Sequence, residues 1–261
     1  MDLGIKGKVA LVTGGGGGLG SAIADSLARE GAKVVVADVN RDALEAVVDA
    51  IRARGGEARG MIWDLADIAG IPERMHEIQE AWGTVDILVN NTGGPPPTTV
   101  QNVGQDDWEK YFQSMVTGVI KLTDAVLPGM AKAGWGRVIT STSSGVIAPI
   151  PNLGISNTLR AALLGWSKTL SREVARDGVT VNVILPGRIA TQRIQQLDVA
   201  KAARDNRPVE EIEKESTGSI PVGRYGKPSE YGDTVAFLSS TAASYITGSV
   251  IRVDGGLIAS I

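Results

Sequence analysis

The sequence predicts an α/β fold in which one parallel sheet is covered by helices on both faces. Short apolar runs of β type recur along the 261 residues and lack the alternation of half-exposed strands. Stretches of helical length separate these runs. The composition, 43% hydrophobic and 21% charged, is that of a globular protein whose core is large enough to fold without disulfide bonds or a structural metal. No repeat or composition break divides the chain, so we expect a single domain over residues 1–261.

We expect about seven strands, of which the third is the weakest: 9–12, 34–37, 58–63, 85–89, 138–139, 179–185 and 250–253. The helices between them are expected near 19–30, 41–54, 72–82, 106–131, 154–177 and 228–240. In the fifth helix, apolar residues recur at spacings of three and four and predict one buried stripe: Leu159, Leu163, Trp166 and Leu170.

The segment 192–218 differs from the rest of the chain because it is polar and highly charged. It lies between the last two predicted strands. Two interpretations remain open for it. The segment is either a mobile lid over a substrate site or a solvated helical insertion.

Charge and composition exclude several classes of function. The 26 Lys and Arg are balanced by 29 Asp and Glu, so nothing favours binding to nucleic acid. The chain has no cysteine and one histidine, His76, which argues against thiol chemistry and His-rich metal sites, and we predict no metal. Residues 1–8 lack the apolar core of a signal peptide, and no stretch is typical of a membrane helix. We expect a cytoplasmic protein without a membrane partner.

A glycine-rich segment, TGGGGGLG, follows the first predicted strand and opens the first helix. In this context Gly14, Gly18 and Gly20 allow a tight turn, close approach of a pyrophosphate and packing of the helix on the sheet. Asp38 ends the second strand 20 residues after Gly18, the spacing of an acid that binds a ribose 2′-hydroxyl. NAD is therefore favoured over NADP, although Arg41 leaves NADP open. The alternative role for Asp38 is an N-cap on the next helix.

These motifs resemble the short-chain dehydrogenase/reductase family, in the classical branch that includes 3-oxoacyl carrier-protein reductases. The TGGGGGLG segment is similar to the family's TGxxxGxG loop, NNTG at 90–93 to its NNAG motif, and the tail 221–257 is typical. The resemblance implies a Rossmann-type doubly wound sheet of seven strands, a small-molecule carbonyl or hydroxyl substrate, and a homotetramer or homodimer. The cofactor-binding residues that it implies are Gly14, Gly18, Leu19, Gly20, Asp38, Asp64, Leu65, Asn90, Gly93, Arg160, Pro186, Gly187, Ile189 and Thr191.

The chain departs from the family at the proton-transfer residues, which are usually Asn, Ser, Tyr and Lys. Alignment on AALLG at 161–165 places Ser156 at the tyrosine position and Arg160 at the lysine position. Met115 stands at the asparagine position, so only the serine, Ser143, is retained. None of the four tyrosines is followed by lysine four residues later. The predicted catalytic residues are Ser143, Ser156 and Arg160.

A serine hydroxyl at position 156 is a weaker acid than a phenol and falls short of a phenol's reach by roughly 4 Å. Arg160 keeps the positive charge but does not deprotonate readily. Three functions remain open. The first is an NAD(P)-dependent oxidoreductase in which Ser143 binds the substrate oxygen and water or a substrate group supplies the proton. The second is an NAD-using epimerase, and the third is a nucleotide-binding sensor or inactive subunit without turnover.

Other residues near the predicted site have alternatives as well. Arg188 either binds an anionic substrate group or forms a surface salt bridge. Thr142 and Ser144 flank Ser143 and replace it if the alignment is shifted by one. The prolines at 95–97 are expected to form a substrate wall, and Tyr111 is expected to pack in the core.

Overall fold

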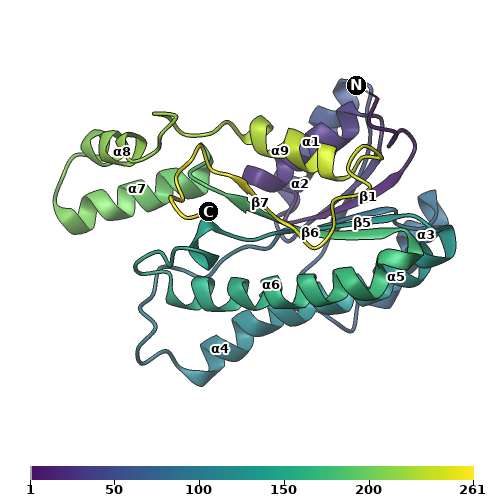
Figure 1. Cartoon of the computed structure of the whole chain (residues 1–261), viewed down its shortest axis with the longest axis horizontal. Helices are drawn as coiled ribbons and strands as arrows, with labels where there is room; N and C mark the ends of the chain where they lie inside the picture. The colour runs from purple at the N-terminus through teal and green to yellow at the C-terminus, as the bar shows by residue number, and fades with distance from the viewer. Residues whose placement is uncertain (1) are drawn as a thin grey trace.

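The computed structural model describes residues 2–261 and confirms the predicted fold class. All neighbouring strands pair in parallel, in the order β3-β2-β1-β4-β5-β6-β7 (Figure 1). The chain therefore reverses its direction of winding between the neighbours β1 and β4. The strands are β1 (Val9–Thr13), β2 (Lys33–Asp38), β3 (Glu57–Ile62), β4 (Ile87–Asn90), β5 (Gly136–Ser141), β6 (Val179–Pro186) and β7 (Val250–Val253).

Helices cover both faces of this sheet, as Figure 1 shows. One face carries α1 (Gly18–Arg29), α2 (Arg41–Ala53) and α9 (Pro228–Leu238), which pack on the sheet through one apolar cluster. The other face carries α3 (Ile71–Trp82), α5 (Gly118–Ala133) and α6 (Gly154–Val174), with α4 (Gln105–Phe112) beside α6. Apolar strands with both faces covered are the reason that the alternation of a half-exposed sheet is missing from the sequence.

The stripe predicted on α6 is confirmed. Leu159, Leu163 and Leu170 are buried, and Trp166 packs against the same two apolar clusters. This stripe fixes the rotation of α6 against the sheet, so Ser156 and Arg160, which lie at matching helical positions, also face inward.

The predicted helix 106–131 differs from the observed structure. It is interrupted by a π-helical turn at Gln113–Thr117, which separates α4 from α5. The π-helical turn ends at Gly118, where the helix lies against the segment after β3. The contact is so close that a Cβ at Gly118 would overlap the Leu65 carbonyl oxygen. The inserted residue changes the direction of the helix at this close approach. Met115 lies inside the turn, and periodicity alone gave no sign of the interruption.

Two strands differ from their predicted bounds by two residues at an end. The run 138–139 is part of the longer β5, whose last residue, Ser141, is buried with its hydroxyl 2.8 Å from the Tyr231 hydroxyl of α9. The strand β4 begins at Ile87, two residues after the start of the run 85–89. Before it, the Asp86 side chain binds Lys8 and accepts from the Val9 amide.

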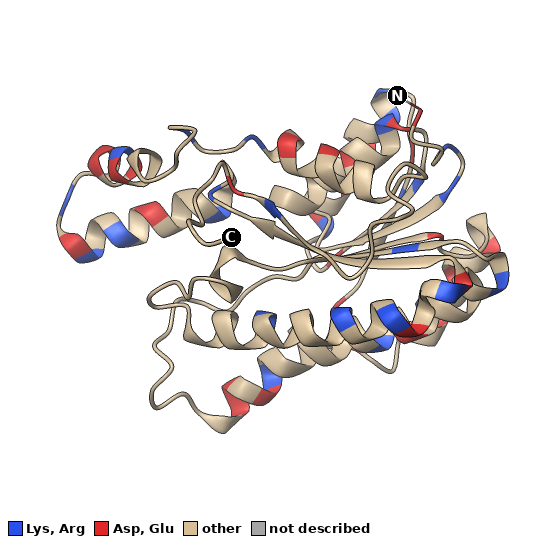
Figure 2. Ribbon diagram, viewed as in Figure 1, with Lys and Arg blue, Asp and Glu red and all other residues tan. Residues whose placement is uncertain are grey.

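Residues 192–218 form two helices, α7 (Gln192–Asp205) and α8 (Val209–Gly218), which extend from the end of the sheet (Figure 1). Charged residues are frequent along these two helices and occur on the other helices, whereas the loops that follow β4 and β5 contain none (Figure 2). None of the helices in residues 2–261 has the length and apolarity to cross a bilayer.

Candidate active site

The predicted site residues gather at the carboxyl edge of the sheet, where β1 and β4 lie side by side. Helix α1 leaves β1 toward one face, and the chain after β4 leaves toward the other. Such a reversal opens a crevice in which α/β proteins bind their ligands. We use the word crevice for the region at this edge that the loops after β1, β4, β5 and β6 surround.

The glycine loop has the conformation that a pyrophosphate site needs. Gly14 and Gly18 both have a φ of 55°, a region that disfavours side chains. A Cβ at Gly20 would overlap the Gly14 carbonyl oxygen, so only glycine permits this approach of helix to loop. No side chain caps the start of α1. Its first amides and the positive end of its dipole are therefore available to an anion, and the loop fits a dinucleotide.

Asp38 lies at the end of β2, beside this loop. Its carboxylate accepts hydrogen bonds from the Gly16 amide at 2.9 Å and from the Asn40 amide at 2.9 Å. The alternative role of Asp38 as a helix cap is wrong, because the N-cap of α2 is Asn40, whose side chain accepts from the Ala43 amide. The carboxylate is held at the crevice, where it can meet a ribose.

Asn91 connects the loop after β4 to the glycine loop, a role that the sequence did not reveal. Its side-chain amide donates to the Gly14 carbonyl at 3.1 Å, and its backbone amide donates to the Thr13 hydroxyl at 3.0 Å. The predicted residue Asn90 has instead a buried side chain, which donates to the Thr123 hydroxyl at 3.1 Å. The alternation of a strand end sends these neighbours to opposite sides.

The remaining predicted cofactor residues border the same crevice or the path toward it. Asp64 follows β3 and accepts a hydrogen bond from the Ala66 amide. On the opposite side, Gly187 donates to the Val253 carbonyl, and Thr191 caps α7. A Cβ at Gly18 would lie 3.7 Å from the Thr191 side chain, so the loop after β6 reaches the glycine loop.

Ser143 stands immediately beyond β5, at the same edge. Its backbone is extended and its half-buried hydroxyl oxygen accepts a hydrogen bond from the Gly145 amide at 3.1 Å. Because the oxygen is the acceptor there, the hydroxyl hydrogen remains available to a ligand.

Arg160 is buried next to this edge, with 8% of its surface exposed. Its Nη2 donates to the Thr92 and Gly93 carbonyls at 3.0 Å each, and its Nη1 donates to the Ser141 carbonyl at 3.4 Å. The Nε donates to Ser156 at 3.3 Å, one helical turn earlier. Burial lowers the pKa of the guanidinium to about 10, so it stays charged at neutral pH.

Met115, at the asparagine position, is buried in the cluster formed by α5 and α6. Tyr111 packs against this cluster, which confirms its predicted core role. Tyr231 is buried on the other face of the sheet, and burial raises the pKa of its hydroxyl. Tyr225 donates to Asp198 at 2.6 Å, and Tyr245 is fully exposed.

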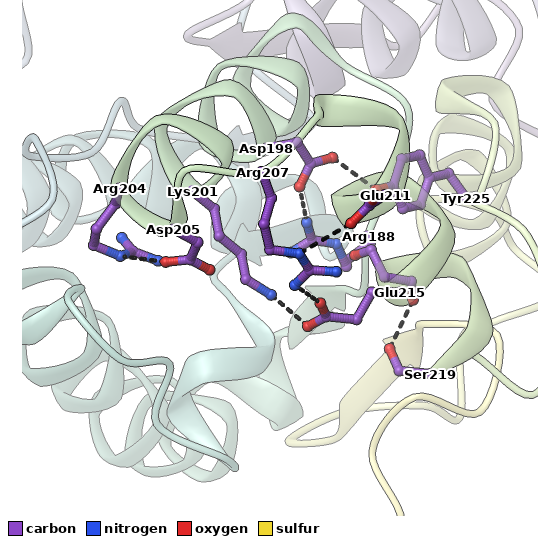
Figure 3. A network of polar contacts seen from close by, with 11 residues as sticks. Arg188, Asp198, Lys201, Arg204, Asp205, Arg207, Glu211, Glu215, Ser219 and Tyr225 are labelled. Carbon is purple, nitrogen blue, oxygen red and sulfur yellow. Dashed lines mark hydrogen bonds and ion pairs between the residues drawn. The ribbon is translucent and has the colours of Figure 1, made fainter.

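Arg188 forms an ion pair with Asp198 of α7. Figure 3 shows the pair together with Tyr225, whose ring lies 5.6 Å from the guanidinium. The carboxylate is 1% exposed, so the salt bridge that was one of the two predicted alternatives exists but is buried on its acidic side. Glu215 of α8 forms two further ion pairs (Figure 3), one with Lys201 of α7 and one with Arg207 of the connection between the two helices.

Comparison with known proteins agrees with this geometry. The model of the enoyl-(acyl carrier protein) reductase family matches residues 15–258. The 3-oxoacyl-[acyl-carrier-protein] reductase FabG of Escherichia coli (strain K12) is 36% identical over 254 residues, which are 97% of this chain and 98% of that protein. This chain belongs to the short-chain dehydrogenase/reductase family.

Two solved structures of this family are similar over almost the whole chain. L-sorbose reductase from Gluconobacter frateurii, complexed with NADPH and L-sorbose, has a TM-score of 0.94, 31% identity and complete coverage of both chains. YwfH, an NADPH-dependent reductase of bacilysin biosynthesis, has a TM-score of 0.92 and 30% identity, covering 97% of this chain and 99% of its own. The doubly wound sheet and the oxidoreductase family are thereby confirmed.

Proposed function

We propose that this short-chain dehydrogenase/reductase uses NAD to interconvert a hydroxyl and a carbonyl group without a catalytic tyrosine. The observation that carries the proposal is the meeting of the glycine loop, Ser143 and the charged Arg160 at one edge of the sheet. A bound nicotinamide supplies hydride transfer. The cofactor would be held by the glycine loop, Asp38, and the predicted residues of the loops after β3, β4 and β6.

The Ser143 hydroxyl donates a hydrogen bond to the substrate oxygen and keeps its own proton. Arg160 fixes the loop after β4 through its bonds to the Thr92 and Gly93 carbonyls, and its charge favours negative charge on that oxygen. Four of the five N–H groups of Arg160 already donate to Ser156, Ser141, Thr92 and Gly93, so Arg160 is not placed to transfer a proton to that oxygen. Water or a substrate group therefore supplies the proton, since Ser156 is short and already bound to Arg160.

Replacement of Ser143 by alanine removes the donor that binds the substrate oxygen. We expect Ser143→Ala to lower kcat about 10²- to 10³-fold, which is typical for loss of one such donor, while the affinity for NAD changes little. The measurement is cofactor reduction or oxidation over a panel of alcohols and ketones. The matched control is Ser144→Ala, the neighbouring hydroxyl. If wild type and Ser143→Ala both bind NAD and neither shows turnover, the oxidoreductase proposal fails.

A nucleotide-binding protein without turnover is the second candidate. It is favoured by two observations: the Ser156 hydroxyl is bound to Arg160, and Met115 cannot position a water molecule. The same panel separates the candidates, because this one predicts tight NAD binding with no turnover. The other function predicted from the sequence, an NAD-using epimerase, stays a prediction.

Asp38 is proposed to give preference for NAD over NADP. A carboxylate about 4 Å from a 2′-phosphate costs about 4 kcal/mol at an effective dielectric constant of about 20. We expect the wild type to bind NADH at least tenfold more tightly than NADPH. In Asp38→Asn the ratio of the Kd for NADPH to the Kd for NADH is expected to be smaller. The control is Asp42→Asn, an exposed acid of the first turn of α2. Equal Kd values for NADH and NADPH in the wild type contradict the assignment.

We further propose a homotetramer or homodimer located in the cytoplasm, with segment 192–218 as the substrate lid. The family resemblance supports the assembly, and β7 is an edge strand with Val250 exposed. The ion pairs of Glu215 with Lys201 of α7 and with Arg207 of the connection support a lid that moves as one piece.

A further inference from the structure

Two arginines face the same short segment of the substrate crevice. Arg160 binds the Thr92 and Gly93 carbonyls from α6, and Arg193 of α7 donates to the Pro95 carbonyl at 3.1 Å. Both guanidinium groups therefore lie along residues 92–95, the loop that follows β4. Arg193 is close enough that its charge disfavours the charged form of Arg160.

Neither charge is neutralised by the protein. Among the ion pairs of residues 2–261, none involves Arg160 or Arg193, whereas the neighbouring Arg188 is paired with Asp198. Two of the four loops that border the crevice, those after β4 and β5, lie in stretches without charged residues, 87–105 and 138–159. Backbone contacts bring these stretches together, because the Thr98 amide donates to the Asn152 carbonyl. Two like charges near one another repel, and an anion bound between them relieves that repulsion.

The two arginines differ in what they can offer to such an anion. Four of the five N–H groups of Arg160 already donate to Ser156, Ser141, Thr92 and Gly93. Arg193 makes one hydrogen bond, to a neutral carbonyl, and its side chain is exposed at the border of the crevice. The rest of its planar fork remains free, and this geometry suits a carboxylate.

We propose that the substrate carries a carboxylate, bound by Arg193 while Ser143 binds the oxygen that is oxidised or reduced. The substrate class is then a hydroxycarboxylic acid or the matching oxo acid. This inference rests on the proposed oxidoreductase function. It adds a residue of the lid helix α7 that selects the substrate by charge.

The test uses 2-, 3- and 4-hydroxybutyrate, each paired with its methyl ester, so that chain length varies across the set and each pair differs by the charge and one methyl group. Binding to the NAD-loaded protein is measured by calorimetry and by the shift of the unfolding temperature, and turnover by NADH absorbance. We expect at least one acid to bind tenfold or more tightly than its ester. Arg193→Gln removes this preference, Arg193→Lys keeps part of it, and all variants bind NAD as the wild type does.

The matched control is Arg204→Gln, which removes the same charge from the same helix at a side chain paired with Asp205. Equal affinity for acids and esters overturns the inference, as does a preference that survives in Arg193→Gln or disappears in Arg204→Gln. Tighter binding of glycerol 3-phosphate than of every acid also overturns it, in favour of a phosphate. Loss of NAD binding, in contrast, refutes the proposed function itself.

Discussion

Gly20→Ala is expected to abolish dinucleotide binding. The added methyl group would overlap the Gly14 carbonyl oxygen, so the loop and the start of α1 must separate. The backbone amides then no longer converge on the pyrophosphate. We expect the Kd for NADH to rise at least a hundredfold, measured by fluorescence titration, with the far-ultraviolet circular dichroism checked for retained fold.

Gly17→Ala is the control from the same loop. Its backbone is extended, and a Cβ there meets no atom within 4 Å. The Kd for NADH is expected to change only a fewfold. Equal affinities in Gly20→Ala and the wild type show that the nucleotide does not bind at this loop, and the assignment of the crevice then fails.

Restoring the family's proton-transfer residues together is expected to have the second large effect. The triple variant Met115→Asn, Ser156→Tyr, Arg160→Lys places a phenol, a lysine charge and a water-binding amide at the crevice. General acid–base catalysis contributes about 10²- to 10⁴-fold, so reduction of generic ketones is expected to appear or rise within that range. Affinity for the nucleotide should stay within a fewfold of the wild type.

Met115→Asn alone is the matched control, because it changes the buried cluster without supplying an acid. The readout is steady-state NADH oxidation with a panel of ketones, together with the unfolding temperature. A triple variant that folds and binds NADH yet shows no gain means that the substrate crevice has diverged beyond these three positions.

The sequence predicted those parts of the site that depend on local spacing. The glycine loop and Asp38 follow from the strand, turn and helix of a single unit, and the inward face of α6 follows from its apolar stripe. Ser143, Ser156 and Arg160 were chosen by alignment with the family's motifs, and the structure places them near one edge of the sheet.

The sequence did not predict the contacts between segments that are far apart in the chain. Arg193 meets Pro95, and Asn91 rather than Asn90 reaches the glycine loop, because the final direction of each strand and loop is decided by tertiary packing. Arg188 pairs with Asp198 because the second turn of α7 lies beside the loop that follows β6. The π turn around Met115 likewise reflects a close approach to Leu65, which no helical periodicity reveals.

Ser141 connects the two layers of helices through a single strand residue. Its carbonyl accepts from Arg160 of α6, while its hydroxyl hydrogen bonds to Tyr231 of α9 on the opposite face. The tyrosine is also bonded to the Ile184 carbonyl of the next strand. A mutant library confined to the crevice lining would leave out α9 entirely. Redesign of this enzyme's specificity therefore has to include the residues of α9 that support Ser141 from the opposite face of the sheet.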